Sequence, residues 1–220
     1  MKFERWLIDS DSATCMCKFG FVDDLTKALG VPLQALCILP QLRYQLNLAK
    51  PAKALEKLGS IEAVEQAQWL TAHATEVIVL ADSANQALLE ATPDIDGGEL
   101  ALFAALLDST DSGLITGDKR ALIALSKVEG AIADGLVWVR ILCTEEAIAL
   151  LIKHLGHAYV SGKVRACPEA NVGLSIVFGR TAPNSEESTS VALKSYIKEL
   201  VANTGGKYTP QYVATTSSLP

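Results

Sequence analysis

The sequence has 220 residues, of which 50% are hydrophobic and 20% are charged, and its formal net charge is −6. A chain of this length and composition can bury a full core, which excludes a disordered protein. Five cysteines without a Cys-x-x-Cys pair are typical neither of a disulfide framework nor of a zinc site. The sequence shows no signal-peptide pattern and no apolar run of about eighteen residues, so we expect a cytoplasmic protein without a membrane partner.

Short apolar segments alternate with helical patterns along most of the chain. We expect strands at residues 3–9, 76–80, 113–118 and 136–142. The apolar spacing predicts three or four helices within 13–73, and further helices at 84–91, from about 99, and at 119–128, 144–155 and 190–203. Strands that alternate with helices predict an α/β protein, a three-layer α/β/α sandwich with a mainly parallel central sheet.

The same pattern divides the chain into three regions. Residues 1–145 contain all the predicted strands and are expected to form the main α/β domain. Residues 146–206 are expected to form a helical C-terminal extension that packs on this domain. Residues 207–220 are rich in Thr and Ser and are expected to form a flexible tail.

Acidic side chains stand at the ends of two predicted strands and at the start of an intervening helix. Asp9 ends the first strand, Asp118 ends the strand at 113–118, and Glu99 opens a helix that should pack on the same sheet. Ligands bind to open parallel sheets beyond the carboxyl ends of the strands, so these three carboxylates are expected to converge. Mg²⁺ and similar hard cations prefer oxygen ligands. One ion, or two roughly 3.5 to 4 Å apart, would activate water for in-line attack on a phosphodiester.

Three short motifs resemble those of the PIN-domain nucleases, a family that includes VapC-like toxins and ribosomal-RNA processing enzymes. They are Leu-Ile-Asp-Ser-Asp at 7–11, Asp-Gly-Gly-Glu at 96–99 and Ile-Thr-Gly-Asp-Lys-Arg at 115–120. The motifs follow the family's order and roughly its spacing. The region of resemblance covers residues 3–142, so residues 1–145 would be a PIN-like nuclease domain.

The resemblance implies a hydrolase, namely a metal-dependent endoribonuclease that cuts single-stranded or structured RNA with Mg²⁺ or Mn²⁺. It implies Asp9, Glu99 and Asp118 as the catalytic residues and primary metal ligands, with Asp11 and Asp96 as supporting ligands. A toxin-antitoxin or defence role fits a protein of this size. The partners would then be RNA and a protein inhibitor (an antitoxin), and a homo-oligomer is an open alternative.

Polar residues around Asp118 are candidate substrate contacts. The Thr116 hydroxyl could hold a water or a phosphate, and Lys119 and Arg120, together with Lys18 and Arg43, could contact phosphates. The alternative is purely structural. Thr116 would then be an ordinary β-branched strand residue, and the cations would lie on a solvated helix face. Lys119 and Arg120 stand where the family often has a further acid, which leaves open whether one or two metal ions bind.

Each acid also has a purely structural explanation. Asp96, Asp118 and Asp11 stand where side chains cap helices. If they only cap, the chain is a catalytically inactive PIN-like binding or assembly module, which its acidic charge favours. Asp9-Ser-Asp11 also formally fits a Mg-dependent phosphatase-type phosphoryl transferase. Because clustered carboxylates repel one another, Asp9→Asn is expected to raise the melting temperature of the metal-free protein.

Overall fold

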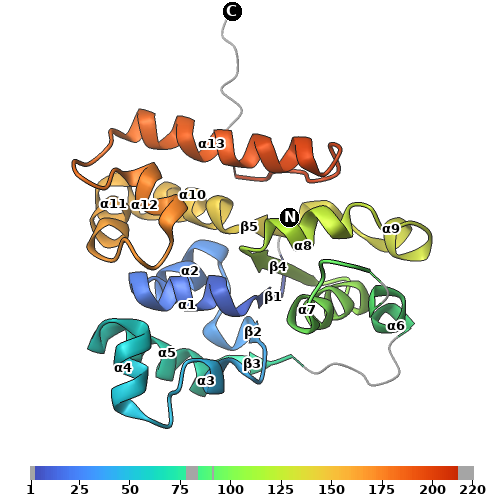
Figure 1. The fold of residues 1–220 in the computed structure, drawn as a ribbon, viewed down its shortest axis with the longest axis horizontal. Helices are drawn as coiled ribbons and strands as arrows, with labels where there is room; N and C mark the ends of the chain where they lie inside the picture. The colour runs from blue at the N-terminus through green and yellow to red at the C-terminus, as the bar shows by residue number, and fades with distance from the viewer. Residues whose placement is uncertain (1–2, 78–83, 91, 213–220) are drawn as a thin grey trace, which may run out of the picture.

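The computed structural model describes residues 3–77, 84–90 and 92–212, and Figure 1 shows the chain as a ribbon. One sheet of five strands has the order β3-β2-β1-β4-β5, and every neighbouring pair is parallel. The strands are β1 (Arg5–Ile8), β2 (Leu36–Ile38), β3 (Thr75–Glu76), β4 (Ser112–Thr116) and β5 (Ile141–Cys143). The α/β class with a parallel central sheet is thus confirmed.

Helices connect these strands and continue after the last one. Those before β4 are α1 (Ser10–Phe19), α2 (Val22–Leu29), the 3-10 helix η1 (Leu33–Ala35), α3 (Leu42–Gln45), α4 (Pro51–Leu58), α5 (Ile61–His73), α6 (Ala84–Glu90) and α7 (Gly97–Asp108). Those after β4 are α8 (Lys119–Leu125), α9 (Ala131–Gly135), the 3-10 helix η2 (Trp138–Arg140), α10 (Thr144–Leu155), α11 (His157–Ala166), α12 (Val172–Phe178) and α13 (Glu186–Asn203). The helices α10 to α13 form the expected C-terminal extension.

Both faces of the sheet are buried. Side chains of successive strand residues point to opposite faces, so one strand contributes to two cores. Trp6 and Ile8 belong to a hydrophobic cluster with side chains from α1, α2, α5 and α10. Leu7 belongs to a second cluster with side chains from α7 and α8. The sheet is therefore the middle layer of three, which confirms the expected sandwich.

The long helix α13 lies beyond the β5 edge of the sheet (Figure 1). Its Leu193 packs in the first cluster, whereas Ile197 and Leu200 pack in the second. One helix therefore covers the sheet edge and joins the two cores. It begins at Glu186, after the N-cap Ser185, rather than at the predicted residue 190.

One prediction in the first half of the chain differs from the structure, and another lies partly outside the described residues. Residues 33–38, which the sequence predicts as helical, form η1 and β2. All three residues of β2 are buried, so the strand lacks the alternation of a half-exposed strand. Of the strand predicted at 76–80, Glu76 lies in β3 and the N–H of Val77 donates to Ile38 O, while residues 78–83, with the predicted helix cap at 82–83, lie outside the described residues.

The second half of the chain has one shortened strand and three α-helices that the sequence analysis does not predict. The strand predicted at 136–142 shortens to β5, because η2 occupies residues 138–140 just before it. The short helix α9 was not predicted, and neither was α11. The apolar segment at 172–178, to which no element was assigned, is α12, which the Asn171 side chain caps.

Residues 207–212 pack against the domain and so differ from the flexible tail predicted there. Tyr208 is buried, and its hydroxyl donates a hydrogen bond to the buried carboxylate of Glu146 and accepts one from the Cys143 N–H at 2.7 Å. Two backbone N–H groups of the segment donate to Glu146 Oε1, at 2.6 and 3.1 Å. These contacts tie the segment to the start of α10, and residues 213–220 lie outside the described part of the chain.

The five cysteines are free thiols, and four of them are buried. Burial raises the pKa of Cys17 to about 12, so this thiol stays protonated at neutral pH. A protonated, buried thiol is a poor nucleophile. Among the described helices, none is long and apolar enough to cross a membrane.

Candidate functional site

The strand order reverses direction at β1, which lies between β2 and β4 in the centre of the sheet. In open parallel sheets, ligands bind beyond the carboxyl ends of the strands at such a switch point. Ile8 pairs with Ile115 at the ends of β1 and β4, and the N–H of the next residue, Asp9, donates to Ile115 O at 3.0 Å. Asp9 therefore stands where a ligand of this fold would bind.

The carboxylate of Asp9 joins three segments at this point. Its Oδ1 accepts a hydrogen bond from the N–H of Ser12 at 2.5 Å, which caps α1, and its Oδ2 accepts one from the N–H of Gly117 at 2.6 Å. The side chain is only 4% exposed. Asp9, and not Asp11 as the sequence suggested, is thus the cap of the first helix, and it also holds the end of β4.

Gly117 is surrounded closely by the same segments. A Cβ atom at this position would lie 3.1 Å from Thr144 Oγ1 and 3.4 Å from Ser12 Oγ. These two hydroxyls lie 3.0 Å apart and form a hydrogen bond. The close approach of α1 and α10 to the backbone after β4 therefore favours glycine here.

Asp118 and Asp96 also cap helices. Asp118 Oδ1 accepts from the N–H of Ala121 at 2.9 Å at the start of α8. Asp96 Oδ1 accepts from the N–H groups of Gly98 at 2.7 Å and Glu99 at 3.1 Å at the start of α7. The caps leave the second oxygen of each carboxylate without a hydrogen bond to the described residues.

All five acids singled out by the sequence line one hollow of about 260 Å³, which we call the acidic hollow. Asp9, Asp11, Asp96, Glu99 and Asp118 contribute to it from the ends of β1 and β4 and from the start of α7. The remaining lining residues are Ser10, Leu39, Gln41, Gln45, Gly97, Gly98 and Leu102. The structure thus brings together acids that are far apart in the sequence.

The negative charge of the acidic hollow shifts the pKa of Asp11. Partial desolvation of the Asp11 carboxyl beside the hollow raises its pKa, and the neighbouring charges of Asp9, Asp118 and Asp96 raise it further, against an opposing effect of Lys57. Within the described residues, the carboxylates of Asp11 and Glu99 make no hydrogen bond or ion pair. The hollow therefore holds uncompensated negative charge.

A divalent cation is the group that such a hollow would hold. The donor chemistry fits, because every charged residue that lines the hollow is a carboxylate and hard cations prefer oxygen. No three His, Cys, Asp or Glu side chains within the described segments lie close enough together, as they stand, to ligate one ion. Asp11 is exposed and Glu99 is half-buried, so both side chains have room to turn inward.

The predicted substrate contacts have different surroundings. Thr116 is 1% exposed and its hydroxyl accepts a hydrogen bond from the N–H of Asp118 at 3.1 Å, so it orients the loop and is not free to bind a ligand. Lys119 Nζ lies 2.5 Å from Glu145 Oε1 and 4.6 Å from the centroid of the Tyr196 ring. Arg120 is exposed and lines two hollows that adjoin the acidic one.

Two polar side chains of the acidic hollow were missed from the sequence. Gln41 and Gln45 line it from the segment that follows β2. They were missed because residues 33–38 were interpreted as a helix, which hid the strand end before them. The apolar run Leu-Cys-Ile-Leu followed by Pro40 was the available signal, since the residue before a proline favours extended backbone over helix.

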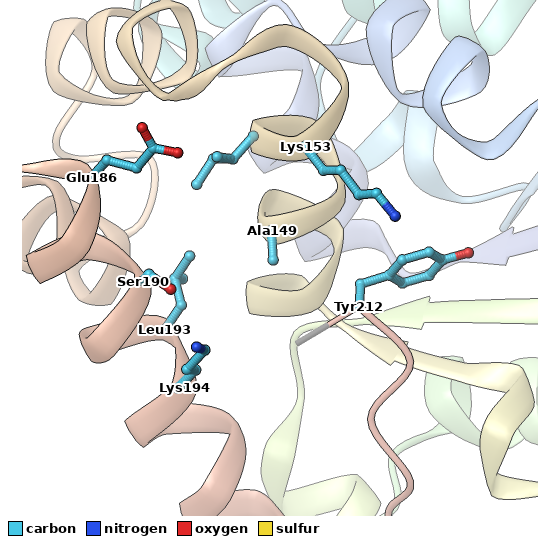
Figure 2. A pocket seen from close by; sticks show the side chains of 8 residues that line it. Ala149, Lys153, Glu186, Ser190, Leu193, Lys194 and Tyr212 are labelled. Carbon is cyan, nitrogen blue, oxygen red and sulfur yellow. The ribbon is translucent and has the colours of Figure 1, made fainter. Parts of the chain in front are cut away.

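A separate hollow of about 360 Å³ lies between α10 and α13 (Figure 2). Ala149 of α10 lies opposite Leu193 of α13, whereas Lys153 extends from the other side of α10, where Tyr212 also lies. Its lining is mainly apolar, and none of the acids of the switch point lies there. The acidic hollow therefore remains the candidate site.

The chain matches no protein-family model, and neither a curated protein nor a solved structure is significantly similar to it.

Proposed function

We propose that this protein is a PIN-like endoribonuclease, a hydrolase that cuts the phosphodiester bonds of RNA with the help of Mg²⁺ or Mn²⁺. One observation carries the proposal: five carboxylates from three separate segments line a single hollow at the switch point between β1 and β4. Capping alone does not require the caps of α1, α7 and α8 to face the same hollow. A metal-dependent phosphodiesterase does require converging carboxylates.

The acids of the hollow would have two roles: one positions the strand ends, and the others bind the metal ion. Asp9 has both oxygens in hydrogen bonds to backbone N–H groups, so it fixes the strand ends and offers its remaining lone pairs to the hollow. Glu99 and Asp118 would be the main ligands beside it, with Asp11 and Asp96 in support. A bound divalent ion supplies charge neutralisation and an activated water for phosphodiester hydrolysis. Burial keeps the Asp9 side chain in place whether or not an ion is bound.

Substrate positioning would come from the cationic side of the site. Arg120 lies in the first turn of α8, directly after Asp118 and Lys119, and it lines hollows that share acids with the acidic hollow. A phosphate held there would place the neighbouring phosphodiester near the carboxylates. In the cell, we propose a cytoplasmic toxin or defence effector, with an antitoxin-like inhibitor or a second copy of the chain as protein partner.

A second candidate, a binding or assembly module without catalysis, is favoured by one specific observation. Asp9, Asp96 and Asp118 each cap a helix, and no three acids in the described segments are close enough to share an ion as they stand. A phosphatase of the Asp-x-Asp type is favoured least. Its nucleophile would be Asp9, whose side chain is held in place by two backbone N–H groups and by burial, so it could not move onto a phosphorus atom.

The experiment that tests the proposal is RNA cleavage with a matched pair of variants. Asp118→Asn removes the carboxylate but keeps a good helix cap, so the fold should be preserved. Asp134→Asn makes the same change at an exposed residue away from the hollow. With Mn²⁺, wild type and Asp134→Asn should cut a mixture of single-stranded and structured RNAs, whereas Asp118→Asn and EDTA-treated wild type should not. Equal cleavage by both variants would overturn the proposed site.

A further inference from the structure

A larger hollow of about 590 Å³ adjoins the acidic hollow and shares Asp11 and Asp118 with it. We call it the adjoining hollow. Its opposite wall comes from the C-terminal extension, at Asn171 before α12 and at Tyr196 in α13. The extension therefore takes part in the surface that leads to the candidate site, as well as covering the sheet edge.

Two cations of this hollow are free to bind an anion. Lys18, in the last turn of α1, and Arg120, in the first turn of α8, both line it. Neither makes an ion pair with a residue in the described part of the chain. Lys119 also lines the hollow but is engaged by Glu145 and Tyr196. Unpaired positive charge thus lies beside the carboxylates, as a substrate with negative charge would need.

Asn171 adds a hydrogen-bonding group of fixed orientation. Its Oδ1 accepts a hydrogen bond from the N–H of Leu174 at 2.9 Å, which caps α12. The cap fixes the amide plane, and the Nδ2 group makes no hydrogen bond within the described residues. An amide nitrogen held in this way can donate to a phosphate, a ribose hydroxyl or a base edge.

From these observations we infer that the adjoining hollow binds a nucleotide of single-stranded RNA next to the bond that is cut, with its phosphate between Lys18 and Arg120 and with Asn171 as a donor. The inference rests on the proposed function for its substrate class. It assigns a substrate-binding role to the C-terminal extension.

The size of the hollow favours one strand over two. Its volume lies within the roughly 300–1,000 Å³ typical of pockets that enclose a small organic ligand. One nucleotide is a ligand of that kind. A duplex presents its bases inside the helix and its phosphates on both sides, so it cannot place a whole nucleotide between the walls at α8 and α12.

The test measures binding by fluorescence anisotropy in EDTA, with a short labelled single-stranded RNA and with the same RNA annealed to its complement. Wild type should prefer the single strand. Lys18→Gln and Arg120→Gln should each raise Kd roughly threefold or more and lower the salt slope of binding by about 0.7, the loss of one phosphate contact. Lys53→Gln, at an exposed lysine of α4, is the matched control and should bind like wild type.

Asn171→Asp tests the contribution of the extension separately. Aspartate caps a helix as well as asparagine does, so α12 and the fold should be retained. The change replaces the donor with a negative charge and should weaken binding of the single strand by more than Lys53→Gln does. Equal binding by Asn171→Asp and wild type would remove the extension from the binding site.

The outcomes separate this inference from the proposed function. If single-stranded RNA binds through Lys18 and Arg120 but Mn²⁺ supports no cleavage, the binding site stands and the nuclease proposal fails. If the protein cleaves RNA while both variants behave like Lys53→Gln, the nuclease proposal stands and the binding site fails. Equal affinity for duplex, or no RNA binding by wild type, overturns the inference.

Discussion

The backbone N–H of Gly117 donates a 2.6 Å hydrogen bond to Asp9 Oδ2, and this bond joins the ends of β1 and β4 at the centre of the candidate site. The same carboxylate caps α1 through Ser12. The residue that a metal site would use is therefore also the residue that builds the site. A substitution of Asp9 therefore changes the stability of the fold as well as the proposed metal site.

Asp9→Asn should destabilise the metal-free protein by about 1–3 kcal/mol. The asparagine oxygen can accept from one backbone N–H, but its NH₂ group then faces the other N–H, which is left unpaired in a buried place. This reverses the higher melting temperature expected from the sequence, because the hydrogen bonds of Asp9 outweigh repulsion among the acids. Urea denaturation in EDTA measures the change, and a raised melting temperature would show that repulsion dominates.

Asp11→Asn should have the opposite effect and stabilise the metal-free protein at neutral pH. The pKa of Asp11 is raised by burial and by Asp9, Asp118 and Asp96, so its charged form is less favourable in the folded state than in the unfolded state. The wild type then loses stability from this group as pH rises from about 3.8 through the raised pKa. The variant lacks that loss. Melting curves of both proteins across this pH range should converge at acidic pH and separate above it.

Strand-end acids were the part of the site that the sequence predicted best. A buried strand that ends in Asp is a local pattern, and the parallel topology brings such ends together, so Asp9 and Asp118 could be placed without a structure. The neighbouring Gln41 was harder to place, because a fully buried three-residue strand lacks the alternation that separates strand from helix and only Pro40 marks its end.

The contacts of the C-terminal residues could not be predicted from the sequence, for a different reason. The segment 207–212 has no periodic apolar pattern, yet Tyr208 is buried and makes long-range hydrogen bonds to the start of α10. Hydrogen bonds between residues 62 positions apart leave no local signal in the sequence. The position of Asn171 in the adjoining hollow was hidden in the same way, since it depends on where α12 packs relative to α1 and α8.

Tyr208→Phe should lower the unfolding free energy by about 1–3 kcal/mol. The hydroxyl accepts from the buried N–H of Cys143 and donates to Glu146, so its removal leaves a buried donor unpaired and takes a partner from a buried carboxylate. Tyr212→Phe is the control, because the Tyr212 hydroxyl makes no hydrogen bond within the described residues. Chemical denaturation compares the two, and equal losses would mean that the Tyr208 hydroxyl has no special role.

The Glu146 carboxylate should make the same region sensitive to pH. Burial raises its pKa above 4.5 and outweighs the hydrogen bonds from Tyr208, Tyr212 and Gln211, which lower it. Folded protein therefore binds this proton more strongly than unfolded protein does, and the group's contribution to stability falls as pH rises through the window above 4.5. Glu146→Gln should flatten the pH dependence of stability in that window. An unchanged pH profile in this variant would show that Glu146 does not titrate differently in the folded state.

Mn²⁺ should stabilise the folded protein through the acidic hollow, by about 2.7 kcal/mol when its concentration is one hundred times Kd. The unfolded chain cannot hold its acids together, so binding energy appears as added stability. Asp118→Asn should lose most of this gain, and in EDTA it should melt no lower than wild type, because asparagine keeps the cap of α8 and removes a charge that repels Asp11. Asp134→Asn should gain as much as wild type. Thermal melts with and without Mn²⁺ measure all three proteins, and a gain that Asp118→Asn retains in full would place the ion somewhere other than the hollow between β1 and β4.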